Sequence, residues 1–249
     1  MIRQFVRSLG TALLIAGVAL ILDAVLTVVW QEPLSAAYSA VVSGQLDDEL
    51  GQLDARGPAS SESAALAALA TRDQRIAYLA RSVRRRVAYG QPIARISIPK
   101  IGVKKAVVDG TDTAALRKGP GLIESTELPG LGGTTAIAGH RTTYGAPFHD
   151  IDKLGKRDKI VVGTPYGDFV YEVSGKRIVK PTDTWVLERI GRERIVLSAC
   201  HPLYSAAQRI IVFGELVRYR APRSGKWAKV LQAVPAGTLT RTASASRAG

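Results

Sequence analysis

The chain has 249 residues, enough for one domain of ordinary size with additional segments, or for two small domains. Its net charge of +13 comes from 34 Lys and Arg against 21 Asp and Glu, so an acidic partner has to be considered. Nucleic acid is not expected as that partner, because the sequence has no helix-turn-helix pattern, zinc finger or aromatic RNA-binding motif to organise the basic residues.

The first element is an apolar run, Leu9–Trp30, with a single charged residue in it. Its 22 residues would form a helix about 33 Å long, sufficient to cross the hydrocarbon core of a bilayer. Arg3 and Arg7 precede the run and acidic residues follow it, so the positive-inside rule places residues 1–8 in the cytoplasm and the rest outside the cell membrane. The alternative is a cleaved signal peptide with a weak site at residues 35–37. The length of the run favours an uncleaved anchor.

Residues 31–89 are interpreted as an extracytoplasmic, partly helical stalk. Ala-rich stretches are interrupted there by the turn-prone pair Gly57-Pro58, and the spacing of apolar residues from Ala64 predicts a helix that ends before Gly90. Residues 72–105 hold ten Lys and Arg and one acidic residue. Such a stretch is typical of a solvated helix face, and close to a membrane it also suits contact with anionic membrane lipids.

Residues 90–220 change in character to short β-rich runs separated by Gly and Pro turns. The expected strands are 94–98, 105–108, 134–138, 159–162, 169–173, 194–197 and 210–219, with one helical turn at 111–116. Seven or eight strands at this spacing, with brief helices, predict an all-β sandwich or barrel. Residues 221–249 are rich in Ser, Ala, Thr and Arg, and are predicted to form a basic, disordered tail.

Cys200 is the only cysteine of the chain, and it ends the β-rich run that starts at Arg194. Outside the cytoplasm cysteines usually pair as disulfides, and this one has no second cysteine to pair with. An unpaired thiol in an oxidising place is a liability unless its reactivity is used. The alternative interpretation is a small buried hydrophobic residue, since free cysteine is among the most buried residue types.

Suitable partners for a cysteine nucleophile stand at other strand ends. His140 follows the run 134–138, and an imidazole can help to form the thiolate. Arg209 opens the next strand after Cys200, and its rigid fork of donors suits a substrate oxyanion. His201 adjoins the cysteine, but its side chain is expected to point to the other face of the strand. No cluster has the spacing of metal ligands, so neither a metal nor another cofactor is expected.

These motifs resemble the sortase family, the membrane-anchored cysteine transpeptidases of Gram-positive bacteria. The resemblance covers about residues 90–218. It is carried by Val196-Leu197-Ser198-Ala199-Cys200, Ala138-Gly139-His140-Arg141, Arg209-Ile210-Ile211-Val212 and Ile98-Pro99-Lys100-Ile101-Gly102. The segments Cys200-His201-Pro202 and Gly139–Phe148 are most similar to the actinobacterial class E branch.

The resemblance implies an eight-stranded β-barrel in which Cys200 is the nucleophile, His140 the acid–base partner and Arg209 the clamp for oxyanion or substrate. It implies secreted protein substrates with a C-terminal sorting signal of the LPxTG type, or LAxTG for class E. The signal is cleaved between Thr and Gly through a thioester, and the acyl group passes to an amine of a peptidoglycan precursor of the lipid II type. Tyr144, Ala199 and His201 are candidates for substrate contact. For Tyr144 the alternative, which the sequence favours slightly, is packing against its own loop.

Two departures from the family pattern concern Val196 and Ala199, where family members usually have threonines. They leave the rate and the exact specificity open. An L,D-transpeptidase-like wall enzyme is a second reading, but its signature has Gly before the cysteine and Arg two residues after it, which Ala199 and Arg209 do not match. A non-catalytic, membrane-anchored binding or assembly module is a third, although such a module would often have lost one of Cys200, His140 and Arg209.

Overall fold

The computed structural model describes residues 2–30, 33–220 and 228–229. Four helices precede the strands, and they are α1 (Ile2–Trp30), α2 (Pro33–Arg56), α3 (Ser60–Ala68) and α4 (Arg72–Arg86). The strands are β1 (Pro92–Ile98), β2 (Val103–Asp109), β3 (Gly121–Leu122), β4 (Thr134–Ala138), β5 (Lys159–Thr164), β6 (Gly167–Val179), β7 (Arg194–His201), β8 (Gln208–Arg220) and β9 (Ala228–Lys229). Short helices lie between them, namely α5 (Thr113–Lys118), η1 (Pro99–Ile101), η2 (Ile151–Lys153) and η3 (Thr184–Leu187).

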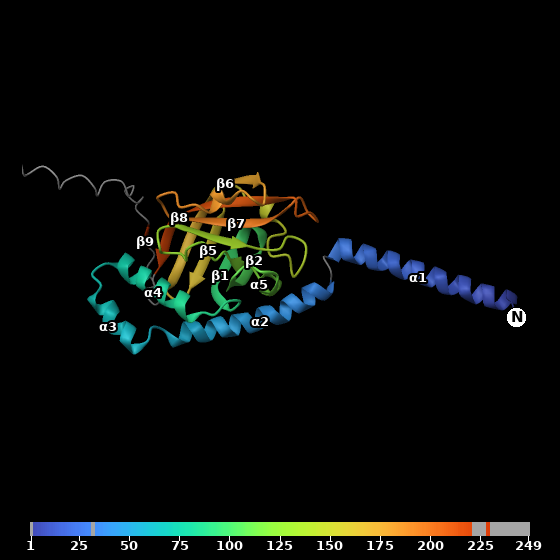
Figure 1. Ribbon diagram of the computed structural model, residues 1–249, viewed down its shortest axis with the longest axis horizontal. Helices are drawn as coiled ribbons and strands as arrows, with labels where there is room; N and C mark the ends of the chain where they lie inside the picture. The colour runs from blue at the N-terminus through green and yellow to red at the C-terminus, as the bar shows by residue number, and fades with distance from the viewer. Residues whose placement is uncertain (1, 31–32, 221–227, 230–249) are drawn as a thin grey trace, which may run out of the picture.

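Eight of these strands form a closed barrel (Figure 1). Their order is β6-β5-β1-β2-β3-β4-β7-β8, and pairing between β6 and β8 closes the ring. Neighbours are antiparallel except for β2 with β3 and β4 with β7, which are parallel. The expected all-β barrel is therefore confirmed. Each run of β-rich residues became a strand, whereas the two-residue strand β3 had no signal in the sequence because it is too short to show alternation.

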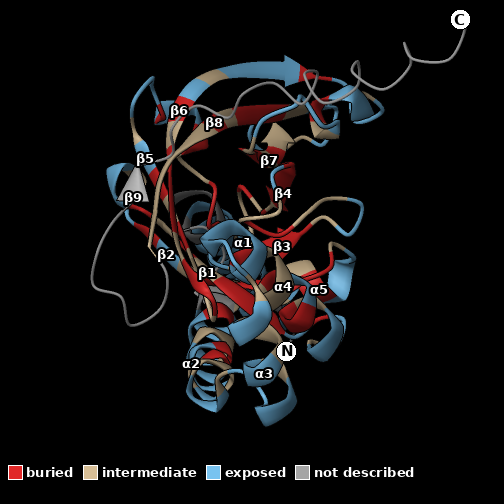
Figure 2. Ribbon diagram, turned by 90° about the vertical axis from the view of Figure 1, so that its left-hand side faces the viewer, coloured by how far each residue is buried: buried red, intermediate tan, exposed pale blue. Residues whose placement is uncertain are grey.

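The main core fills the inside of the barrel, as the buried segments in Figure 2 show. Alternation along β7 sends Ile195, Leu197 and Ala199 inward, and all three belong to this core. Val196, on the opposite face of the same strand, belongs to a second cluster with Val186 of η3. Fully burying an aliphatic or aromatic side chain contributes roughly 1.5–3 kcal/mol, so the inward residues fix which face of β7 looks outward.

Helix α2 packs against the barrel, which differs from the expected stalk. Leu46 and Leu50 of α2 are buried, with 4% and 1% of their surface exposed, and Leu46 packs against Val108 of β2. An ion pair of 2.6 Å joins Asp54 of α2 to Arg95 of β1. Figure 1 shows α2 running along one side of the barrel. This segment is thus part of the folded domain.

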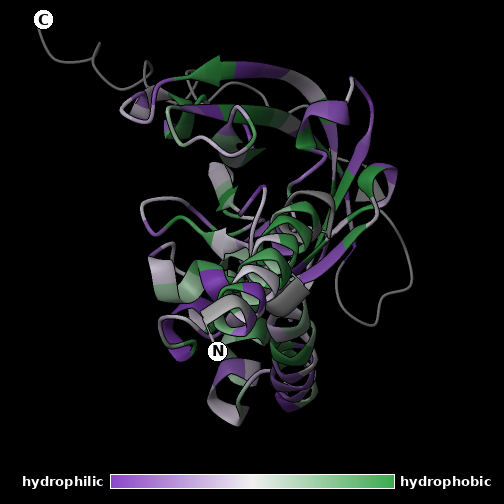
Figure 3. Ribbon diagram, turned by 90° about the vertical axis from the view of Figure 1, so that its right-hand side faces the viewer, coloured by the Kyte–Doolittle hydropathy of each residue, from purple (hydrophilic) through white to green (hydrophobic). Residues whose placement is uncertain are grey.

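Helix α1 contains the predicted membrane segment. Residues Gln4–Val25 are long and apolar enough to cross a bilayer, and none of that stretch is buried inside the protein. In Figure 1 the helix extends away from the barrel, and in Figure 3 the hydrophobic colour dominates its ribbon. Length and composition are compatible with a membrane anchor.

The predicted tail, residues 221–249, lies outside the described residues except at β9. There Ala228 and Lys229 pair with Tyr219 and Arg218 of β8. This pairing adds a ninth strand to the sheet without being part of the closed ring.

Candidate active site

Cys200 and Arg209 are directly opposite each other on two antiparallel strands. Cys200 is the seventh residue of β7, and the register pairs it with Arg209 near the start of β8. Directly opposed residues in such a ladder project their side chains to the same face, with Cβ atoms about 4.5–5.5 Å apart. That face is the outer one, because Val196 lies on it while Ala199 points into the barrel. Both residues are partly exposed there.

His140 reaches the same place from β4. This strand runs parallel to β7, with Ala138 paired to Ser198, and the Gly139 N–H donates to the Ser198 carbonyl at 3.0 Å. Cys200 follows Ser198 by two residues within β7, and His140 follows Ala138 by two residues, just beyond the end of β4. His140 thus belongs to the segment that continues from the strand beside β7. A side chain at Gly139 would lie 2.6 Å from the ring of Phe148, so this close approach requires glycine.

The surroundings of His140 favour the neutral form of its imidazole. Burial lowers the pKa of His140 below its ordinary value of 6.5, and the positive charge of Arg117 acts in the same direction. The Nε2 atom of His140 is buried and makes no hydrogen bond to any described residue. A neutral imidazole with an unengaged ring nitrogen is able to accept a proton from a nearby thiol.

The guanidinium of Arg209 is turned toward the loop between β7 and β8. Its Nη1 atom donates to the carbonyl oxygens of Ala206, at 2.9 Å, and Gln208, at 3.0 Å. These bonds hold the side chain at the end of the strand where Cys200 stands. Cys200 and Arg209 are therefore paired across β7 and β8, and His140 follows β4, the strand next to β7. The action of the three residues as one site stays a prediction.

Tyr144 lies against His140, at the centre of a cluster of rings and charge. Its ring centroid is 5.3 Å from that of His140 and 6.4 Å from that of Tyr38 on α2. The guanidinium of Arg117, on α5, stands over the ring at 5.6 Å. The Tyr144 N–H donates to Ser35 Oγ of α2 at 3.3 Å. Substrate contact by Tyr144 stays a prediction. Its packing against α2 and α5 had no signal in the sequence, because these partners come from distant segments.

Ala199 and His201 point away from the face that carries Cys200. Ala199 is 2% exposed and belongs to the interior core, so the structure gives no support to a substrate contact through its side chain. His201 contacts Arg141, with 3.2 Å between His201 Nδ1 and Arg141 Nη1. The role of Arg141 was missed, because its burial cannot be read from a basic residue in a loop.

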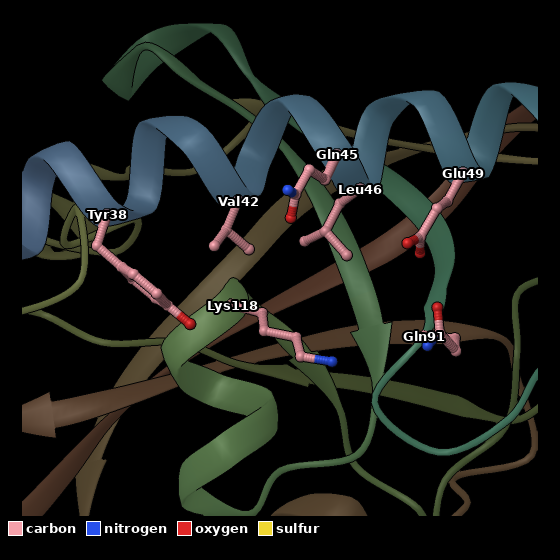
Figure 4. A pocket seen from close by; sticks show the side chains of 7 residues that line it. All are labelled: Tyr38, Val42, Gln45, Leu46, Glu49, Gln91 and Lys118. Carbon is pink, nitrogen blue, oxygen red and sulfur yellow. The ribbon is translucent and has the colours of Figure 1, made fainter.

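A hollow lies between α2 and the barrel, and neither Cys200, His140 nor Arg209 lines it (Figure 4). Its lining side chains come from α2, α5 and the approach to β1, and they are Tyr38, Val42, Gln45, Leu46, Glu49, Gln91 and Lys118. Tyr38 links it to the ring cluster around Tyr144. Within the part of the chain that the structure describes, no group of three or more His, Cys, Asp or Glu is placed to hold a metal ion.

A closed eight-stranded barrel of this kind is the architecture of the sortase class of domains. Residues 96–217 match the family model described as the sortase domain. The solved structure of sortase E from Streptomyces avermitilis is similar, with a TM-score of 0.51 and 34% identity over 56% of this chain and 96% of that one. The chain belongs to the sortase family.

Curated relatives agree with this assignment. Sortase D of Bacillus subtilis is 32% identical over 132 residues, which are 51% of this chain and 65% of that protein. Sortase SrtE1 of Streptomyces coelicolor is 30% identical over 154 residues, which are 55% of this chain and 44% of that protein. The matches thus span less than two thirds of the length of these relatives.

Proposed function

We propose that this protein is a cysteine transpeptidase of the class E type, held in the cell membrane by α1 with the barrel on the extracytoplasmic face. Its substrates are secreted proteins with a C-terminal sorting signal similar to LAxTG or LPxTG, cut between Thr and Gly. The acceptor is an amine of a cell-wall precursor. Membership of the sortase family supports the reaction class, and the similarity to sortase E and Sortase SrtE1 supports the subclass.

The observation that supports the proposal is the pairing of Cys200 with Arg209 across β7 and β8, beside the strand β4 that leads into His140. In the proposed site the thiol of Cys200 is the nucleophile, the imidazole of His140 the proton acceptor and the guanidinium of Arg209 the oxyanion donor. A dead binding module would not need all three.

The chemistry follows from these roles. His140 takes the thiol proton as the Cys200 sulfur attacks the Thr carbonyl carbon, and Arg209 stabilises the oxyanion of the tetrahedral intermediate. When the intermediate collapses, the C–N bond to Gly breaks and His140 returns the proton to the departing amine. The acyl group is then a thioester on Cys200. The acceptor amine attacks this thioester and loses a proton, and the thiol of Cys200 is regenerated.

The test is mass spectrometry of the full-length protein in detergent micelles, incubated with LAxTG and LPxTG peptides. We expect the protein to gain the mass of the peptide cut after Thr, as an adduct on Cys200 that hydroxylamine removes. Cys200→Ala is the control and should form no adduct while it melts at the same temperature, because one small side chain has changed. Peptide cleavage at an unchanged rate by Cys200→Ala would contradict the proposal.

A further inference from the structure

The residues that follow His140 and Cys200 in sequence are bonded to each other. Arg141 comes directly after His140, and His201 directly after Cys200. On β7 successive side chains point to opposite faces, so His201 lies behind the face that carries the cysteine. There its Nδ1 atom is 3.2 Å from Nη1 of Arg141.

Arg141 is fixed from several sides. Its side chain is 3% exposed, and Nη2 forms an ion pair of 2.8 Å with Asp152 Oδ1. Its Nε donates to the His149 carbonyl at 3.1 Å, and His149 Nδ1–H donates to the Arg141 carbonyl at 2.8 Å. A guanidinium held by a carboxylate and a carbonyl presents its remaining donor in one direction. That direction is toward His201.

The contact determines where the His201 ring carries its proton. Arginine is a donor only, so His201 Nδ1 must accept from Arg141 Nη1. A proton on Nδ1 would break the contact. His201 acts in this contact as a hydrogen-bond acceptor.

No backbone hydrogen bond among the described residues joins His140 to Cys200. Among the described residues, the bond from Gly139 N–H to the Ser198 carbonyl is the furthest backbone link between β4 and β7 toward the site. Beyond it the chain at His140 turns into its loop, where the Phe148 N–H donates to the His140 carbonyl. The contact of Arg141 with His201 is the next link between the two segments.

We propose that Arg141 and His201 are positioning residues that hold the His140 imidazole at proton-transfer distance from the Cys200 sulfur. We call this contact the Arg141–His201 brace. This inference rests on the proposed function, because the proposed function supplies the reaction in which His140 and Cys200 take part. Displacing a reacting group by about 1 Å can lower a rate by roughly 10²-fold, so a brace behind the pair acts on the rate without touching substrate.

Three variants of His201 separate this role from others. In His201→Asn the amide oxygen occupies the place of Nδ1 and still accepts from Arg141. In His201→Gln the same amide is carried one methylene further, and in His201→Leu the acceptor is gone. Each variant is made in the full-length protein, and the melting temperature in detergent micelles shows whether it is folded.

Two rates are measured for each variant. One is the single-turnover rate of adduct formation with an LAxTG peptide, and the other is alkylation of Cys200 by iodoacetamide at pH 7. We expect both rates to fall in His201→Leu and His201→Gln, the first by roughly 10²-fold, and to be largely regained in His201→Asn. The KM for the peptide should stay unchanged.

The brace is wrong if all three variants react at the rate of the native protein. It is also wrong if His201→Asn is as slow as His201→Leu, since the ring itself would then be needed. Alkylation does not depend on any peptide. If alkylation follows the expected order but no adduct forms with any peptide, the brace stands and the proposed function fails.

Discussion

The imidazole that the proposed function assigns to Cys200 as proton acceptor, His140, loses its proton more easily than a free histidine does. Burial and the charge of Arg117 both lower the pKa of His140. Its unfolded-state pKa is therefore the higher of the two, and the unfolded chain binds more protons in the interval between them. Acidification through that interval favours unfolding, and the neutral form of His140 is retained in the folded protein to lower pH than in a free histidine.

Arg209 is expected to act through the shape of its guanidinium as well as through its charge. In Arg209→Lys the positive charge remains, but one compact ammonium replaces a planar fork that suits a carbonyl or oxyanion. Loss of an oxyanion donor typically costs about 10²–10³ in rate, so kcat/KM for peptide cleavage should fall by a factor of that order.

The control for Arg209→Lys is Arg177→Lys, the same change at an exposed residue of the neighbouring strand β6. Steady-state cleavage of a fluorogenic LAxTG peptide measures both variants. We expect Arg177→Lys to cleave at the native rate. If Arg209→Lys had the same kcat/KM as the native protein, Arg209 would not be the clamp for the oxyanion.

At the scale of elements, strands were easier to predict from the sequence than the docking of helices. Short β-rich runs bounded by turn residues predict strands directly, and the run Thr134–Ala138 became β4 without a shift in its ends. In α2 two buried leucines stand among polar and acidic residues. The helix therefore packs against the barrel through a narrow apolar face, which is hard to recognise in the sequence. Cys200, His140 and Arg209 could be proposed as site residues because each lies near the end or start of a β-rich run and matches a motif of the sortase family. Arg141 and Arg117 could not, because their roles depend on contacts across loops.

If α2 is an integral part of the domain, truncating its buried face should be costly. Leu46→Ala removes a side chain that is 4% exposed and packs against Val108 and Ala115. Such changes lower the free energy of unfolding by about 2–5 kcal/mol. Val41→Ala, on the same helix but 66% exposed, should change it by less than about 0.5 kcal/mol.

Urea denaturation of the full-length protein in detergent micelles measures both variants. Equal stability of Leu46→Ala and Val41→Ala would mean that α2 does not contribute its buried face to the folded domain.

At the scale of the whole molecule, the chain consists of an apolar helix, a docked helix and a barrel. Under the proposed function, the basic residues before the apolar run and the acidic residues after it orient α1 with its N-terminus inside. The barrel of the proposed enzyme then faces the wall, where both the sorting signal and the acceptor amine are found. The direction of α1 is therefore a requirement of the proposal.

The single cysteine makes this orientation directly measurable. A membrane-impermeant maleimide added to intact cells should label Cys200, slowly because the residue is only partly exposed, and the protein should gain the mass of one label. Cys200→Ala controls for labelling elsewhere, and permeabilised cells give the full extent of reaction. Labelling that needs permeabilisation would place the barrel in the cytoplasm.

The pairing of Cys200 with Arg209 makes the domain unequally tolerant of insertions and deletions. Residues 202–207 form the loop between the paired ends of β7 and β8. Extra residues there would lengthen the loop without changing the register of the two strands. Losing one residue from 195–199 would instead invert the orientation of everything beyond it, turning the sulfur into the barrel and an aliphatic side chain outward. Engineers who want to graft new recognition loops near the thiol should therefore build at the tip of the hairpin and leave the strand untouched.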